Sequence, residues 1–233
     1  MVIETNEFTF VDDNLLGDKP EEALELFKAI QKLKKKFRFF GNFDIGLIQH
    51  EALIEEFVKA GGHSVFMGLE SLEPNNLKLL DKLKQIPVPR NRTITREDVE
   101  EFYHKAILKL QSYGITVFTG FICGFDEDTT NSTEQLIRFC REVPDGSYLA
   151  ILTPFPGTSL FTRFRRENRL KQPLEYQLFD FNHLIFVHPV LSDKEIYKMV
   201  LQFYEALGLE QIARAKSSKV KRTIKTPDIC DMS

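Results

Sequence analysis

The chain has 233 residues, of which 42% are hydrophobic and 28% charged, and its formal net charge is −3. This balance is ordinary for a globular domain with a sizeable core and excludes a fibrous or largely disordered protein. The small net charge gives no reason to expect nucleic acid or an anionic membrane as a partner. No apolar run reaches the roughly 18 residues of a membrane span, and the N-terminus lacks the features of a signal peptide, so we expect a cytoplasmic protein.

Short apolar runs alternate with segments of helical periodicity, which predicts an α/β fold. Helices are expected at about residues 21–36, 51–60, 74–84, 95–113, 160–169 and 192–207, with another that contains Leu136 and Cys140. Strands are expected near Phe8, Phe39, Val65, Val117 and Leu149. Each strand leads into a helix or loop and none into a hairpin turn, so the strands are predicted to be parallel. Five units are few for a closed barrel, so either the sheet is open or a first unit is missing.

Local signals place several of the predicted boundaries. Gly61-Gly62 is a glycine stop signal for the helix before it. Thr95 precedes Asp98 by three residues, which is a capping signal at the start of a helix. Residues 153–158 contain two prolines, which remove backbone donors and therefore predict a stiff loop at the end of the last strand.

The stretch from His63 to Ser71 holds the first candidate site. Its apolar centre is typical of a strand buried on both faces, and Glu70 and Ser71 follow directly at its end. In (β/α) barrels the carboxyl ends of the strands carry the active site, so both residues are site candidates. The alternative is that Glu70 caps the helix that begins near Pro74.

The first strand ends in a second acidic candidate, Asp12-Asp13, which could instead cap the helix that follows. The three cysteines, Cys123, Cys140 and Cys230, are too far apart to indicate a disulfide framework or a zinc site. Four histidines have no partner at a recognisable spacing and are expected to be structural or exposed: His63, His104, His183 and His188. No catalytic acid or base can be named from the sequence.

Six stretches, in this order, resemble the radical S-adenosylmethionine (SAM) superfamily, in the branch with an N-terminal cobalamin-binding domain. They are FVDDN at 10–14, AGGHSVFMGLES at 60–71, NNLKLLDKLKQ at 75–85, GFICGFDEDT at 120–129, ILTPFPGTSLF at 151–161 and FDFNHLIFVHP at 179–189. The resemblance implies a partial TIM-like (β/α) barrel without its first unit at residues 1–165. A C-terminal helical extension at 166–212 and a disordered polar tail at 213–233 would follow.

The resemblance also implies which residues bind SAM. Residues 120–127 match the family's G-x-I-x-G-x-x-E pattern, in which Ile122 would contact adenine and Gly124 would allow close backbone approach. Glu70 and Ser71 match the position that reaches the ribose or the polar tail, where a carboxylate can accept two hydrogen bonds.

Two further segments are implied to contact SAM. Asp12 and Asp13 occupy the position that binds the SAM amino group in other members, and which of the two makes the contact is open. The loop that begins Thr153-Pro154-Phe155 matches the segment whose backbone groups meet adenine.

The family binds a [4Fe–4S] cluster through C-x₃-C-x₂-C, and this sequence has no such triplet. Its three cysteines are therefore not expected to be cluster ligands, and no metal site is predicted. The simplest interpretation is that the cluster loop and the cobalamin domain lie upstream of residue 1. A natural relative without a cluster is the alternative.

The implied chemistry is reductive cleavage of SAM to a 5′-deoxyadenosyl radical, which abstracts hydrogen from an unactivated carbon. Methylation by way of cobalamin often follows in this branch, and other members catalyse cyclisation or rearrangement. An external electron donor is implied. The stretch at 179–189 resembles hopanoid methylases, which indicates a small-molecule or lipid-like substrate. Two hypotheses follow: the core of a cobalamin-dependent radical SAM enzyme, or a cluster-free barrel that serves as a nucleotide-binding or scaffold module.

Overall fold

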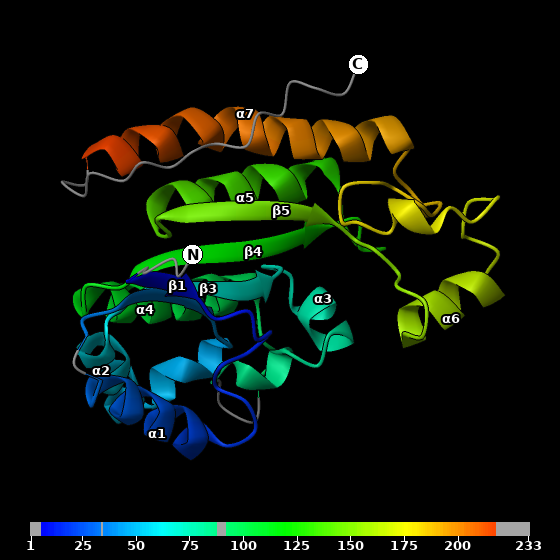
Figure 1. The fold of residues 1–233 in the computed structure, drawn as a ribbon. Helices are drawn as coiled ribbons and strands as arrows, with labels where there is room; N and C mark the ends of the chain where they lie inside the picture. The colour runs from blue at the N-terminus through cyan, green and yellow to red at the C-terminus, as the bar shows by residue number, and fades with distance from the viewer. Residues whose placement is uncertain (1–5, 34, 88–91, 218–233) are drawn as a thin grey trace, which may run out of the picture.

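The computed structural model describes residues 6–33, 35–87 and 92–217, and for 209–217 only the backbone. Five strands form one sheet in which every neighbouring pair is parallel and the spatial order follows the sequence (Figure 1). The strands are β1 (Glu7–Thr9), β2 (Arg38–Asn42), β3 (Gly62–Glu70), β4 (Thr116–Cys123) and β5 (Gly146–Ile151). The sheet curls into a half-barrel. The predicted parallel α/β architecture is therefore confirmed.

Seven α-helices are present in the described part of the chain: α1 (Pro20–Gln31), α2 (Glu51–Ala60), α3 (Pro74–Leu79), α4 (Arg96–Ser112), α5 (Thr130–Glu142), α6 (Ser159–Arg166) and α7 (Asp193–Ser217). Alternating apolar side chains bury one face of the central strand β3, where Val65, Met67 and Leu69 point into the core. The rings of Phe27, Phe39 and Phe57 join α1, β2 and α2 at centroid distances of 5.2–5.9 Å. The opposite face of the sheet is less buried and is therefore available for a ligand-binding site.

The two predicted helix signals act as expected. Gly61 adopts a left-handed φ of 106° directly after α2, and a Cβ there would lie 1.9 Å from the Phe37 carbonyl oxygen. Thr95 and Asp98 form a reciprocal capping box at the start of α4. Both boundaries therefore come from backbone requirements that are visible in the sequence.

Other boundaries differ from the prediction. α1 ends at Gln31 and not near residue 36, because the lysine-rich segment that follows offers few apolar side chains to the core. The helix expected at 74–84 is split into α3 and a 3₁₀ turn, Leu83–Gln85, by a left-handed φ of 57° at Asp81. The helix expected at 192–207 continues as α7 to Ser217.

The edge of the sheet at β5 is covered by the C-terminal segment. The Tyr204 hydroxyl of α7 donates to the Leu149 carbonyl oxygen (3.0 Å) and accepts from the Leu149 N–H (3.1 Å). The Phe181 carbonyl oxygen accepts from the Ile151 N–H at 2.7 Å. These bonds occupy groups that an exposed edge would offer to another chain.

The division into a barrel at 1–165, an extension at 166–212 and a tail at 213–233 stays a prediction. α7 includes residues 213–217, and residues 218–233, together with Cys230, lie outside the described residues. Within the described chain, no helix has both the length and the apolar character needed to cross a membrane.

Candidate functional site

The carboxyl ends of β1, β2 and β3 surround a hollow of about 450 Å³ on the open face of the sheet. Asp13 comes from the loop after β1, Glu70 from the end of β3 and Lys82 from the segment after α3. Phe66 and Phe181 supply apolar wall, and Phe181 reaches the hollow from the C-terminal segment. The hollow therefore combines charged groups with aromatic surface, as ligand sites commonly do.

Glu70 is held in an unusual backbone conformation. The register of β3 against β4 shifts between Gly68 and Glu70, so Leu69 is an extra residue in a β-bulge. The Tyr103 hydroxyl donates to the Leu69 carbonyl oxygen at 3.0 Å and fixes the bulge from α4. Glu70 itself has a left-handed φ of 68°. Bulges re-aim side chains, and such strain persists where the surrounding structure enforces it, often at functional sites.

A lysine that the sequence analysis missed holds the Glu70 carboxylate. Lys82 Nζ donates to Glu70 Oε1 at 2.8 Å and to the Gly68 carbonyl oxygen at 2.7 Å. The side chains of Lys82 and Glu70 are only 26% and 21% exposed. A Cβ at position 68 would lie 2.3 Å from Glu70 Oε1, so glycine makes room for the carboxylate. No sequence spacing predicts this pair, because α3 and the left-handed turn at Asp81 lie between Glu70 and Lys82 in the sequence.

The capping alternative for Glu70 is wrong. The residue before α3 is Glu73, and no side chain caps that helix. The Ser71 hydroxyl instead accepts a hydrogen bond from the Glu73 N–H at 3.0 Å. Ser71 is 7% exposed, so its oxygen organises the turn beside Glu70.

Only one residue of the acidic pair lines the hollow. Asp13 does, whereas Asp12 contributes its carbonyl oxygen to a hydrogen bond from Asn42 Nδ2 (2.9 Å). Neither aspartate caps α1, which begins after Lys19. The loop is shaped by Asn14, a residue that sequence reasoning did not single out. Asn14 Oδ1 accepts from the backbone N–H groups of Leu16 and Asp44 at 3.1 and 3.0 Å, which ties the ends of β1 and β2 together.

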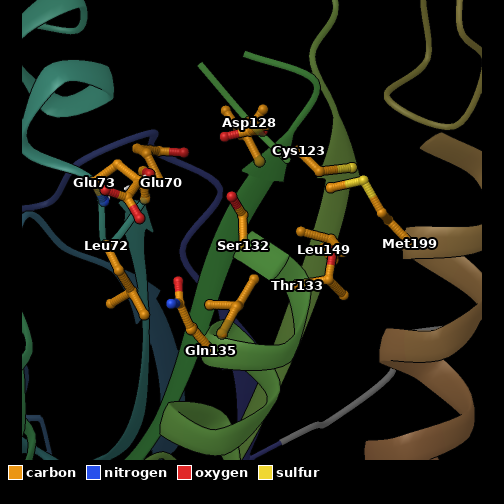
Figure 2. Close-up of a pocket in the computed structure, with 13 residues that line it drawn as sticks. Glu70, Leu72, Glu73, Cys123, Asp128, Ser132, Thr133, Gln135, Leu149 and Met199 are labelled. Carbon is orange, nitrogen blue, oxygen red and sulfur yellow. Dashed lines mark hydrogen bonds between the residues drawn. The ribbon is translucent and has the colours of Figure 1, made fainter. Parts of the chain in front are cut away.

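A second, smaller pocket of about 30 Å³ lies between the ends of β3 and β4 and the first turns of α5. Figure 2 shows Glu70 and Glu73 on one side of it and Asp128 on the other, with Ser132 of α5 between. The predicted adenine contact Ile122 lines this pocket, and so does Ser71. Glu70 lines both cavities, so it joins the two predicted halves of the site.

The turn after β4 is built around Asp128. Its Oδ2 accepts from the N–H groups of Gly124 (2.8 Å) and Phe125 (3.0 Å), and its Oδ1 accepts from Asn76 Nδ2 (3.0 Å). Burial raises the pKa of Asp128 to about 6 in spite of these bonds. Gly124 has a φ of 99°, which explains the glycine at this position.

The loop after β5 contributes less directly. Thr153 is buried and its hydroxyl donates to the Ile151 carbonyl oxygen at 3.0 Å, and Pro154 is buried beside it. The centroids of the Phe155 and Phe181 rings are 5.0 Å apart. Phe155 is therefore not part of the lining of the hollow, but it contacts Phe181, which is.

Three of the four histidines have partners that spacing did not reveal, and the first is His63, whose Nδ1 lies 2.8 Å from the Phe39 carbonyl oxygen. His183 Nδ1 lies 2.9 Å from Asp180 Oδ2, and His183 is half exposed. The buried His188 donates from Nε2 to the Phe125 carbonyl oxygen (2.7 Å), and its Nδ1 accepts from the Leu191 N–H (2.8 Å). His188 thus ties the segment before α7 to the turn after β4.

The described residues do not suit an iron–sulfur cluster. Burial raises the pKa values of the Cys123 and Cys140 thiols to about 12, which opposes thiolate formation. Across residues 6–33, 35–87 and 92–217, no three His, Cys, Asp or Glu side chains are grouped so as to hold a metal ion.

The chain is thus a parallel half-barrel that carries polar groups at the carboxyl edge of its sheet. No family model matches the chain. The solved radical SAM methyltransferase TsrM from Kitasatospora setae, with tryptophan and a SAM analogue bound, is similar in fold with a TM-score of 0.57 and 13% identity. That match covers 85% of this chain and 42% of TsrM.

Sequence similarity points to methyltransferases. The bacteriochlorophyllide d C-12(1)-methyltransferase of Chlorobaculum tepidum is 28% identical over 81% of this chain and 38% of its own length. The hopanoid C-2 methylase of Rhodopseudomonas palustris is 28% identical over 69% of this chain and 29% of its own length. The resemblance to cobalamin-branch radical SAM methyltransferases and the predicted partial barrel are confirmed. The chain spans about a third of the length of these two relatives.

Proposed function

We propose that this chain is the SAM-binding core of a cobalamin-dependent radical SAM enzyme that methylates, or otherwise modifies, an unactivated carbon of a small molecule. The sequence relatives that are methyltransferases support the reaction class. The observation that carries the proposal is the position of Glu70, a strained and anchored carboxylate that lines both cavities at the carboxyl edge of the sheet.

The described residues suit the parts of SAM. In this proposal Glu70 accepts hydrogen bonds from the ribose hydroxyls, and Asp13 binds the amino group from the other side of the hollow. Ile122 packs against adenine, with Gly124 beside it. Ser71 supports the turn next to Glu70, and Asp12 holds the loop that carries Asp13.

Adenine would also meet the loop that begins Thr153-Pro154-Phe155, through its backbone. When bound, SAM supplies either a methyl group or a 5′-deoxyadenosyl radical. The residues named here bind and orient SAM. The described residues offer no group of three ligands for the [4Fe–4S] cluster of the proposed enzyme.

The substrate class follows from the wall of the hollow. Phe181 is 43% exposed, and its ring leads through Phe155 to the rings of Phe179 and Tyr176. Such a surface suits an apolar ring system. The relatives that are named for bacteriochlorophyllide and hopanoid substrates agree with this choice.

The test is a titration of the isotope-labelled chain with S-adenosylhomocysteine, followed by amide chemical shifts in NMR spectra. We expect shifts at Glu70, Ile122 and Gly124 and at least a tenfold loss of affinity in Glu70→Ala. The matched control is Glu101→Ala, which removes a carboxylate paired with Lys105 on the outer surface of α4. Equal affinity in the Glu70→Ala variant would contradict the role of this residue.

The same titration separates the proposal from its alternative, a cluster-free nucleotide-binding module. Adenosine monophosphate lacks the methionine part of SAM. If it bound as tightly as S-adenosylhomocysteine at the same residues, the nucleotide-binding module would be favoured. If neither compound shifted these resonances, the proposed SAM site would be wrong.

A further inference from the structure

A buried polar link joins the two segments that are proposed to hold SAM. Asn76 Nδ2, in the first turn of α3, donates to the Ser71 hydroxyl oxygen (3.1 Å) and to Asp128 Oδ1 (3.0 Å). Ser71 directly follows Glu70. Asp128 accepts from the N–H groups of Gly124 and Phe125, in the turn that follows Ile122. One amide group therefore connects the end of β3 to the end of β4.

The link is enclosed. Asn76 is 0% exposed and Asp128 5% exposed. Asn76 belongs to α3 and Asp128 to the turn before α5, and they are 52 residues apart in sequence. Hydrogen bonds of this kind are stronger in a low-dielectric interior, and the acceptor here is a carboxylate. The distance between the two segments is thus set by a short contact that water does not loosen.

The link is also costly, which argues against a purely stabilising role. With both donors of its amide directed at Ser71 and Asp128, Asn76 leaves its buried Oδ1 without a partner among the described residues. A buried polar atom in that state costs about 1–3 kcal/mol. Apolar side chains of similar shape would fill the space without that cost. Apolar side chains could not, however, hold the segment after β3 at a fixed distance from the turn after β4.

We propose that Asn76 and Asp128 are positioning residues that couple the Glu70 segment to the turn at Gly124. Asn76 lines neither cavity, and Asp128 lines only the smaller one. Their link keeps the carboxylate for the ribose and the apolar contact for adenine at a fixed separation, so that one molecule meets both at once. The ligand in this statement rests on the proposed function, whereas the coupling of the two segments does not.

The sharpest variant is Asn76→Asp, assayed at a pH well above the Asp128 pKa of about 6, where a carboxylate at position 76 and the Asp128 carboxylate repel each other. The exchange Asn76→Asp with Asp128→Asn restores a donor and an acceptor with their positions reversed. In the exchanged pair, the new Asn keeps its oxygen toward the N–H groups of Gly124 and Phe125. If Asn76 and Asp128 served only to fill space, the double exchange would not restore ligand binding.

The chain offers a matched control at the opposite end of β4. There Gln111 Nε2 donates to Asp145 Oδ2 (3.1 Å), which also accepts from the Val117 N–H (2.8 Å). Gln111→Glu therefore creates a carboxylate repulsion beside the same strand, at a part-buried position at the opposite end from the proposed site. It reports what a general loss of stability does to ligand binding.

Two readouts decide the proposal. In Asn76→Asp we expect at least tenfold weaker binding of S-adenosylhomocysteine and at least tenfold faster hydrogen exchange of the Gly124 and Phe125 amides, beyond any global change. The double exchange should return the affinity for S-adenosylhomocysteine and the hydrogen-exchange rates of the two amides to within threefold of the values for the parent chain. Gln111→Glu should leave affinity within twofold.

Equal losses of affinity in Asn76→Asp and Gln111→Glu would overturn the proposal, and so would failure of the double exchange to recover either readout. If the parent chain bound no S-adenosylhomocysteine, the proposed function would fail, but the exchange of the Gly124 amide would still test the coupling. Unchanged protection of that amide in Asn76→Asp would then refute the link itself.

Discussion

Glu70 offers a test of whether the site stores backbone strain. Its φ of 68° is a conformation that glycine adopts freely and other residues adopt at a cost. We therefore compare Glu70→Gly with Glu70→Ala. Both variants remove the ion pair with Lys82, so the difference between them isolates the backbone contribution at this position.

The magnitude can be worked from the geometry. A left-handed residue with a Cβ costs about 1–2 kcal/mol relative to its right-handed form. Glycine loses about 0.5–1 kcal/mol more than alanine on folding, because its unfolded chain is freer. The difference favours Glu70→Gly over Glu70→Ala by about 0–1.5 kcal/mol, which corresponds to roughly 0–6 °C in Tm for a chain of this size. At an ordinary strand position with negative φ, glycine should instead be less stable than alanine.

Urea denaturation followed by circular dichroism measures both variants, with Lys82→Met as a reference for the lost ion pair. That pair is mostly buried, with side chains 26% and 21% exposed, so its removal should destabilise all three variants. If Glu70→Gly were less stable than Glu70→Ala, Glu70 would not be under backbone strain. The inference that its carboxylate is placed at a cost in stability would then be refuted.

Three further outcomes are expected. Burial raises the pKa of Asp128 from 3.8 to about 6, so between these pH values the folded chain binds a proton that the unfolded chain has lost. The contribution of Asp128 to the free energy of unfolding should therefore fall as pH rises from about 4 to 6. Asp128→Asn should flatten this dependence, while the nearby titratable groups Glu70, Glu73 and His188 are still present in the variant. Tyr204→Phe should cost about 1–2 kcal/mol in urea denaturation and increase association in light scattering, because it exposes the edge of β5. Gly61→Ala should lower Tm by roughly 4–8 °C, since a Cβ there meets the Phe37 carbonyl oxygen 1.9 Å away and about 2 kcal/mol or more is lost.

The fold could be predicted because its signals are local. The strand near Val65 is rich in apolar residues, although only its Val65, Met67 and Leu69 face is fully buried and not both faces as expected, and Gly61 ends α2 by a backbone conformation that glycine alone adopts readily. The Thr95 cap is likewise contained in four residues. Errors arose where the boundary depends on tertiary contacts. The left-handed turn at Asp81 has no glycine to announce it, so α3 was predicted too long.

The site could be predicted only in part, for a related reason. A carboxylate at the end of a buried strand is visible in the sequence, and Glu70 and Asp13 do line one hollow. The partners that place them are not visible. Lys82 reaches Glu70 across α3, and Asn76 reaches Asp128 across 52 residues. Such contacts follow from how successive loops meet at one edge of the sheet, which no spacing rule encodes.

These contacts share a physical logic. Loops at the carboxyl edge bury apolar anchors such as Leu72 and Phe125, but apolar contacts are not directional and do not by themselves fix polar groups at a set distance. In this chain polar contacts hold these loops: Asn14 to the backbone of Asp44 and Asn76 to Asp128 join successive βα units, and Lys82 to Glu70 lies within one unit. Directional bonds fix distance and orientation where apolar contacts would allow sliding. Removing any one should therefore disorder the edge before it unfolds the sheet, because the apolar core around Phe39 and Val65 lies on the other face.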